Sequence, residues 1–283
     1  MDRQKFDTFP ITLPIKKIIR ETPYVKTFVF AYRLGSRPGQ FVNLWIPRVD
    51  EKPMSIAYDH GDEFGLTVFA VGAMTKRLHE MKPGDRVGVR GPFGRGFEYR
   101  SGQHLMMVGG GYGVAPLYFL TREALQKKCS VDFVVGARSK EHLLYTDRVK
   151  KMKGVKLHVA TDDGSVGVKG YNTLLLEKLI FDMKRTASGR AKLRKCTVFA
   201  VGPEVMMKRV SDICTTEKKT GIACQVSVER YMKCGFGVCG NCCIDESGIT
   251  VCTEGPAMDH RQARKNSDFG YFHRDSVGRK HPY

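Results

Sequence analysis

Residues 104–117 read HLMMVGGGYGVAPL, an apolar run followed by a glycine-rich turn and the beginning of a helical pattern. A parallel strand that ends in such a turn directs backbone N–H groups at a pyrophosphate beside the helix N-terminus. The turn departs from G-x-G-x-x-G because Pro116 occupies the position of the third glycine, and proline suits the first turn of a helix. Gly111, Gly113 and Pro116 are therefore candidate dinucleotide-binding residues.

A second glycine turn supports this interpretation. The segment AVGPE at 200–204 also joins a strand to a helix, so we expect Gly202 at the same carboxyl edge of a parallel sheet. Strands are expected at 105–108, 131–136, 155–160 and 198–201, with helices at 114–127 and 171–183. Asp162 and Asp163 follow the third of these strands and favour the ribose of NAD over the 2′-phosphate of NADP, or they simply form a turn.

The chain before this region has a different periodicity. Runs rich in β-forming residues occur at 24–30, 41–46, 65–71 and 86–90, and Pro38-Gly39, Gly61-Asp62 and Pro83-Gly84 separate them. This pattern predicts an antiparallel β-barrel. We therefore expect a barrel over residues 1–100, an α/β domain with a parallel sheet over 101–221, a cysteine-rich segment over 222–258 and a basic tail over 259–283.

The cysteine-rich segment carries the strongest chemical signal. Within KCGFGVCGNCCIDESGITVC at 233–252, the residues Cys234, Cys239 and Cys242 have the C-x4-C-x2-C spacing of plant-type [2Fe–2S] proteins, and Cys252 supplies a fourth thiolate. Interleaved glycines let the backbone curl closely around an inorganic cluster. Four thiolates also suit structural zinc, although zinc usually takes paired Cys-x2-Cys units. Cys243 is expected to point away and be buried, and Cys129, Cys196, Cys214 and Cys224 to be ordinary thiols.

Composition limits the other possibilities. The 283 residues are 42% hydrophobic and 27% charged, which is typical of a globular protein, and no run of 18 apolar residues is present. No secretory signal begins the chain, so we expect a cytoplasmic protein with reduced cysteines that does not enter a membrane. The net charge of +18 raises the question of nucleic acid, but the basic run at 184–195 lacks aromatic residues on which bases stack. That run is expected to be a solvated loop, or else a docking patch for an acidic protein.

Taken together, residues 8–258 resemble the electron-transfer subunits of NAD-dependent dihydroorotate dehydrogenases, a branch of the ferredoxin reductase superfamily. The resemblance rests on KPMS at 52–55, Met74-Thr75, GPFGRGF at 91–97, the Gly111 to Pro116 turn and CTEGP at 252–256. Lys52 stands where the family has arginine, which keeps the charge but not the bidentate fork, and Met74 replaces a glycine.

The resemblance implies an FAD site in the barrel. Its contacts would come from Lys52, Pro53, Met54 and Ser55, from Thr67, Val68 and Phe69 on the strand beside the isoalloxazine, and from Met74 and Thr75 near the pyrophosphate. The implied protein is an oxidoreductase subunit that passes electrons between NAD(H), FAD and a [2Fe–2S] cluster.

The resemblance also implies a partner. This would be an FMN-containing dihydroorotate dehydrogenase catalytic subunit, in a heterotetramer of two of each, acting in de novo UMP synthesis. The flavin subunits of soluble hydrogenases, sulfite reductases and ferredoxin-dependent transhydrogenases share the layout and remain alternatives. A zinc- or nucleic-acid-binding regulator on the same scaffold is an alternative from another class.

Overall fold

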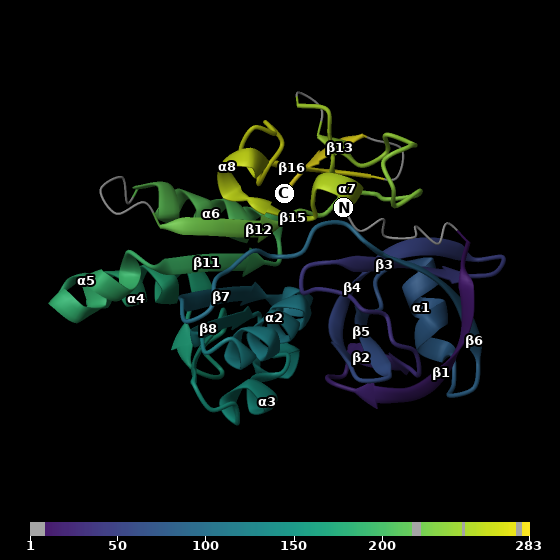
Figure 1. Ribbon diagram of the computed structural model, residues 1–283, viewed down its shortest axis with the longest axis horizontal. Coiled ribbons are helices and arrows are strands. Elements are labelled where there is room, and N and C mark those ends of the chain that lie inside the picture. Colours follow the sequence, from purple (N-terminus) through teal and green to yellow (C-terminus); the bar gives the residue numbers. More distant parts are fainter. Residues whose placement is uncertain (1–8, 217–221, 245–246, 276–278) are drawn as a thin grey trace.

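The computed structural model describes residues 9–216, 222–244, 247–275 and 279–283. Figure 1 shows a β-barrel on one side, a sheet covered by helices on the other, and the C-terminal part of the chain lying across both. This is the arrangement of a ferredoxin-reductase-like protein with an added C-terminal region. Among the described helices, none is both long and apolar enough to cross a membrane.

The barrel is closed and its strands pair antiparallel throughout, in the order β1-β2-β5-β4-β3-β6. Its elements are β1 (Ile11–Arg20), β2 (Val25–Phe30), β3 (Phe41–Ile46), β4 (Asp50–His60), β5 (Glu63–Phe69), α1 (Ala73–Glu80) and β6 (Arg86–Phe93). The predicted barrel is confirmed, and its core is filled by side chains such as Phe28, Phe30 and Phe64. Strands β1 and β4 were not predicted, because charged residues and prolines interrupt their apolar pattern.

The second sheet has the order β10-β9-β8-β7-β11-β12-β15. Its strands are β7 (His104–Gly110), β8 (Ser130–Ala137), β9 (Val155–Thr161), β10 (Val168–Lys169), β11 (Cys196–Val201), β12 (Ala223–Ser227) and β15 (Ala257–Asp259). All neighbours are parallel except β12 and β15, which pair antiparallel. The parallel α/β sheet is therefore confirmed, with one antiparallel edge strand added.

Helices cover both faces of this sheet. One face packs against α2 (Val114–Gln126) and α3 (Thr146–Lys150), and the other against α4 (Asn172–Lys184) and α6 (Glu204–Thr216). The basic run at 184–195 is not a loop, because it contains the exposed helix α5 (Ala187–Leu193), which Thr186 caps by accepting a hydrogen bond from Gly189 N–H. The proposed domain boundaries at residues 221 and 258 stay predictions. Strand β12 lies beyond the first boundary and β15 spans the second, and both belong to the same sheet as β7 to β11.

The barrel and the sheet meet through helix α2 and the start of α3. Phe119 of α2 packs into the barrel core. The Tyr145 hydroxyl, just before α3, bonds to the hydroxyls of Thr27 and Thr67 in the barrel. Arg148 pairs with Glu21 at 2.8 Å, and the Glu21 side chain is only 7% exposed. These polar contacts fix the barrel against the sheet near the glycine turns.

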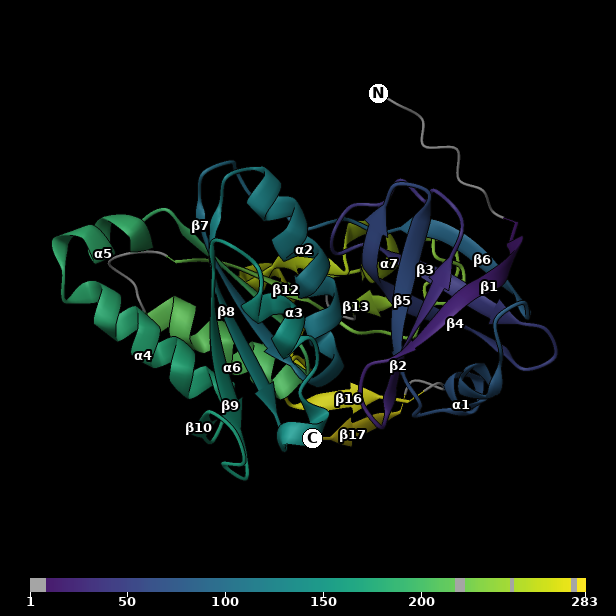
Figure 2. The same ribbon diagram turned by 90° about the horizontal axis from the view of Figure 1, so that it is seen from below.

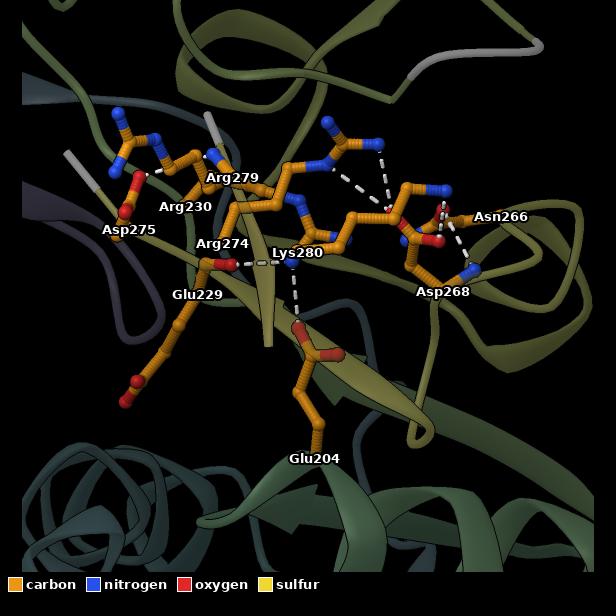
Figure 3. A network of polar contacts seen from close by, with 9 residues as sticks. All are labelled: Glu204, Glu229, Arg230, Asn266, Asp268, Arg274, Asp275, Arg279 and Lys280. Carbon is orange, nitrogen blue, oxygen red and sulfur yellow. Dashed lines mark hydrogen bonds and ion pairs between the residues drawn. The ribbon is translucent and has the colours of Figure 1, made fainter. Parts of the chain in front are cut away.

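The C-terminal tail is an ordered cap in its described part. Its elements are α8 (His260–Ala263), β16 (Phe272–Arg274) and β17 (Lys280–Pro282). Figure 3 shows the charged contacts that hold it, with Arg274 and Lys280 converging on Asp268. Glu204, which begins α6, accepts from Arg230 at 2.6 Å and from Gly270 N–H at 3.4 Å. The tail is thus tied to the second glycine turn and to the segment before the cysteines.

A largely buried cluster of one carboxylate and two imidazoles lies toward the amino end of the parallel strands. Asp132 of β8 is 2.9 Å from His104 Nε2 of β7 and 2.8 Å from His158 Nε2 of β9. Burial raises the pKa of Asp132, but the two imidazoles outweigh burial and hold the pKa below its usual range. Because the pKa of the Asp132 carboxyl is lower in the folded chain than in the unfolded chain, its ionised form stabilises the fold above pH ~4. This stabilisation is lost as the pH falls further.

We predict that Asp132→Asn lowers the free energy of unfolding by about 2–4 kcal/mol at pH 7, since it leaves two imidazoles without their carboxylate. Urea denaturation of both proteins measures this difference, which should shrink as the pH falls below 4. Glu80→Gln is the control, because Glu80 pairs with Arg77 on the surface, and such a pair contributes about 1 kcal/mol at most. Equal effects of the two variants would show that the cluster is not stabilising.

Candidate cofactor sites

The two glycine turns lie side by side. Strands β7 and β11 are parallel neighbours with Gly109 opposite Val201, so both turns leave the same carboxyl edge. A Cβ on Gly113 would lie 2.4 Å from the Val201 carbonyl oxygen, and one on Gly202, whose φ is +153°, would lie 3.0 Å from the Gly110 backbone. The close approach of the two backbones therefore requires glycine at these positions. Pro116 lies in the first turn of α2.

Tyr112 links the first glycine turn to the barrel. Its ring stacks on Phe69 at the end of β5, with centroids 6.1 Å apart and an interplanar angle of 13°. The negative charge of Glu229 and then burial raise the pKa of Tyr112 to about 12. In Figure 3 the Glu229 carboxyl group points away from the charged network of the tail. Phe69, Tyr112 and Glu229 thus bring together the barrel, the nucleotide edge and the segment before the cysteines.

The other two predicted β5 residues face opposite sides of the strand, with Val68 in the barrel core and Thr67 toward the α/β part. The Thr67 hydroxyl bonds to Tyr145 and, at 2.8 Å, to Thr27. Val68 is 3% exposed and belongs to the barrel core, and its carbonyl oxygen lies 2.9 Å from His79 Nε2. Among the three, Phe69 is the residue whose ring faces the glycine turn.

The KPMS stretch lies within β4, opposite β3. Pro53 pairs with Asn43, Met54 with Val42 and Ser55 with Phe41. Ser55 is exposed, whereas Met54 packs at the edge of the barrel core. Lys52 Nζ lies 2.6 Å from Asp50 and 5.8 Å from the centroid of the Tyr231 ring. Lys52 therefore brings positive charge to the junction of the barrel and the cysteine-rich segment.

Helix α1 begins at the position expected for a pyrophosphate. Gly72 is its N-cap, and a Cβ there would meet open space. Thr75 Oγ1 accepts from the N–H groups of Val71 and Gly72 at 3.0 Å, so it stabilises the turn. Met74 is 2% exposed and packs in the barrel core. Free N–H groups of the first helical turn, rather than the Met74 side chain, are what this end offers an anion.

The four cysteines form two pairs. Cys234 lies beside Cys239, and Cys242 beside Cys252, whose N–H donates to Cys242 Sγ at 3.3 Å. Among the described His, Cys, Asp and Glu residues, no three converge as ligands of a single ion. A two-iron cluster with four cysteine ligands takes two thiolates at each iron, so the paired arrangement fits [2Fe–2S] better than one tetrahedral zinc.

The backbone around these thiols is shaped for a cluster. Gly235, Gly237 and Gly240 have φ values of +88°, +85° and +69°, as expected for a loop that curls around it. Burial raises the pKa of Cys234, but N–H groups of Cys239 and Phe236, together with other donors, outweigh burial and lower the pKa to about 6. Burial and the Cys242 thiol raise the pKa of Cys252 to about 12. Cys239 is exposed, whereas Cys242 and Cys252 are buried.

The remaining cysteines follow the predictions with one exception. Cys129, Cys196, Cys214 and Cys224 are all buried free thiols. Cys243 was expected to be buried, but it is only half-buried, because it lies in the short hairpin of β13 (Cys243–Ile244) and β14 (Ile249–Thr250), where Sγ contacts the Gly248 carbonyl oxygen at 3.7 Å. α7 (Val251–Glu254) follows this hairpin and carries Cys252.

Asp162 and Asp163, which follow β9, have different roles. Asp163 Oδ1 accepts from the N–H group and hydroxyl of Ser165 at 2.9 and 2.6 Å, so this side chain forms the turn. These hydrogen bonds lower the pKa of Asp163. Asp162 is exposed at the same edge. The turn interpretation therefore accounts for Asp163, and Asp162 is the carboxylate that the edge offers to a ribose.

Several functional candidates were missed by sequence reasoning. Arg90 of β6 donates to the carbonyl oxygens of Lys233 and Cys234, both at 3.0 Å, and Asn43 of β3 donates to Lys233 at 2.9 Å. These contacts join residues that are more than a hundred positions apart, so no local pattern signals them. Tyr112 was inside the quoted glycine turn, and its aromatic ring was the available signal.

Comparisons with known proteins agree with this geometry. Residues 107–212 match the oxidoreductase NAD-binding domain, and residues 229–263 match the iron–sulfur cluster binding domain of dihydroorotate dehydrogenase B. A relative from Methanocaldococcus jannaschii is 40% identical over 96% of this chain and 98% of its own length, and one from Pyrococcus abyssi is 37% identical over 94% and 96%. Both are described as "Probable dihydroorotate dehydrogenase B (NAD(+)), electron transfer subunit".

A solved structure of an NADH-dependent reduced ferredoxin-NADP oxidoreductase has a TM-score of 0.75 and is 28% identical to this chain, covering 90% of this chain and 92% of its own. The FAD/NAD-binding domain of a nitric oxide dioxygenase from Vibrio cholerae, at 19% identity and a TM-score of 0.65 over 76% and 97%, shows the same fold.

A barrel, two adjoining glycine turns and paired thiols define an oxidoreductase of the ferredoxin-reductase class that uses FAD, NAD(H) and a [2Fe–2S] cluster. Relatives that are 40% identical over nearly the whole chain narrow this class to one family. This chain belongs to the family of electron-transfer subunits of NAD-dependent dihydroorotate dehydrogenase B.

We predict that Cys239→Ser abolishes the [2Fe–2S] electron paramagnetic resonance signal, because Cys239 is paired with Cys234 as a ligand. Bound FAD, measured by absorbance after gel filtration, should remain, since the barrel core does not include the cysteine loop. Cys243→Ser is the matched control and should keep the signal. A signal that survives in Cys239→Ser and vanishes in Cys243→Ser would contradict the ligand assignment.

We predict that Lys52→Glu weakens FAD binding by about tenfold, because it places a negative charge beside Asp50 and near the anionic cofactor. Fluorescence titration of the flavin-free protein with FAD measures the dissociation constant. Lys17→Glu makes the same charge change at an exposed position of β1 and serves as the control. If both variants bind FAD equally well, Lys52 does not belong to the flavin site.

Proposed function

We propose that this chain passes electrons between NAD(H) and a separate FMN-containing catalytic subunit in de novo UMP synthesis. Oxidation of dihydroorotate on that subunit would send electrons to this chain and form NADH, and NADH would supply the electrons for the reverse reaction. The observation that carries the proposal is the pairing of the four thiols on a loop fastened to the flavin-type barrel. Cys234, Cys239, Cys242 and Cys252 are the proposed cluster ligands.

The three sites have complementary chemistry. Nicotinamide delivers two electrons together, an iron–sulfur cluster takes one at a time, and bound FAD exchanges both, so FAD belongs between them. The nicotinamide nucleotide is assigned to Gly111, Gly113, Pro116 and Gly202, where the two turns offer backbone N–H groups. Phe69 and Tyr112 close the space between this edge and the barrel.

FAD is assigned to the outer face of β4 and β5 and to the start of α1. The residues proposed are Lys52, Pro53, Met54, Ser55, Thr67, Val68, Phe69, Met74 and Thr75. Val68 and Met74 contribute backbone groups, because their side chains are buried in the core. Positive charge at Lys52 and the N–H groups of α1 would balance the pyrophosphate.

Electrons pass between this chain and its partner on the side of Cys239. Cys239 is exposed, and its neighbour Val238 is 77% exposed, so a partner can approach the cluster there. An exposed apolar residue beside a redox centre suits a protein interface. A reducing cytoplasm agrees with the free thiols of all nine cysteines. The assembly proposed there is a heterotetramer with two copies of each subunit.

The similar ferredoxin-NADP oxidoreductase structure favours one rival function, in which the electrons go to or come from ferredoxin. The two functions differ in the partner rather than in the path inside this chain. Coupling to dihydroorotate oxidation therefore separates them.

We predict that the chain loaded with FAD and [2Fe–2S] oxidises NADH with a tetrazolium dye but does not oxidise dihydroorotate. Adding an FMN-containing dihydroorotate dehydrogenase subunit should couple the two reactions, measured as NADH formation from dihydroorotate and NAD+. Cys239→Ser should lose this coupling. Dihydroorotate oxidation by the chain alone, or coupling to ferredoxin only, would contradict the proposal.

A further inference from the structure

Arg90 occupies an unusual position between the barrel and the cysteine loop. Its side chain is only 11% exposed. Nε and Nη2 donate to the two carboxylate oxygens of Glu51 at 2.7 and 2.8 Å, while Nη1 and Nη2 donate to the carbonyl oxygens of Cys234 and Lys233, both at 3.0 Å. One guanidinium group therefore contacts the flavin-side strand β4 and the backbone of the first cluster ligand at once.

Neighbouring residues complete this anchor. Asn43, which is opposite Arg90 in the barrel and fully buried, donates a second hydrogen bond to the Lys233 carbonyl oxygen at 2.9 Å. Gly235 lies against the Phe93 ring so closely that a Cβ would be 2.7 Å from it. The residues on both sides of Cys234 are thus fixed to β3 and β6 of the barrel.

The charge of Arg90 has a separate consequence. Reduction adds a negative charge to the cluster, so a nearby and largely buried cation that is hydrogen-bonded to a ligand residue stabilises the reduced form. Glu51 partly cancels this charge. Lysine would keep the charge but lacks the planar fork that reaches Glu51 and two carbonyl groups together.

We propose that Arg90 is a positioning residue for electron transfer between FAD and the cluster, which fixes the backbone of Cys234 on the barrel and raises the reduction potential of the cluster. This inference rests on the proposed function, because it takes Cys234 as a ligand and the barrel as the flavin site. Glu51 sets how much of the Arg90 charge acts on the cluster.

The test uses the full chain loaded with FAD and iron–sulfur cluster, and four variants: Arg90→Gln, Arg90→Lys, Glu51→Gln and Arg86→Gln. Iron and flavin contents are measured first. A redox titration followed by electron paramagnetic resonance then gives the reduction potential of each cluster, and stopped-flow absorbance gives the rate of cluster reduction by NADH. Arg86→Gln is the control, because Arg86 lies on the same strand but is exposed.

We expect the potential to fall in Arg90→Gln and to rise in Glu51→Gln, since the first removes a positive charge and the second a negative one. If these substitutions only loosened the cysteine loop, the reduction potentials of both variants would shift in the same direction. Cluster reduction by NADH should slow by about tenfold or more in Arg90→Gln, and by less in Arg90→Lys. Arg86→Gln should match the unmodified chain.

Equal potentials in the Arg90, Glu51 and Arg86 variants would overturn the inference, as would shifts of one sign in the Arg90 and Glu51 variants. Loss of iron from Arg90→Gln alone, with normal potentials in Arg90→Lys and Glu51→Gln, would reduce Arg90 to a structural residue and also overturn it. These outcomes differ from failure of the proposed function, in which NADH does not reduce the cluster of the unmodified chain at all.

Discussion

Hydrogen bonds from buried polar side chains of the barrel hold the other two parts of the molecule in place. Thr27 and Thr67 bond to Tyr145 at the start of α3, and Arg90 and Asn43 bond to the carbonyl groups beside the first cluster cysteine. Such groups are costly to bury without partners, so each of these contacts favours one relative placement of the parts. Figure 2 shows the barrel beside the sheet, and Figure 1 shows the C-terminal part lying across both. Electron transfer between three cofactors requires this fixed arrangement, because it needs short and constant distances.

The local chemistry of the sites could be predicted from the sequence. Glycines with positive φ around the thiols, and glycines where two backbones meet at Gly113 and Gly202, are requirements that a short motif expresses. The alternation of strands and helices after residue 100 likewise reflects burial of each strand on both faces. These parts of the prediction depended only on residues close together in the chain.

Contacts between distant segments could not be predicted in this way. Arg90, Glu51 and Asn43 appear in the sequence as ordinary polar residues of strands, and only the closed barrel brings them to residues 233 and 234. The same limit explains the basic run at 184–195. Its charges suggested a loop, whereas the Thr186 cap and the apolar contact of Leu193 stabilise a helix whose remaining side chains are mostly solvated.

The two departures from the family pattern have different physical consequences. Met74 replaces a glycine without entering the cofactor face, because its side chain fills the barrel core beneath α1, and the N–H groups of the helix remain available to an anion. Lys52 replaces an arginine at a position where a charge partner, Asp50, and an aromatic ring, Tyr231, are already in contact with it. A compact ammonium group satisfies both contacts, but it cannot also supply a bidentate fork. In the proposed FAD site, more of the phosphate recognition would therefore rest on the backbone N–H groups of α1.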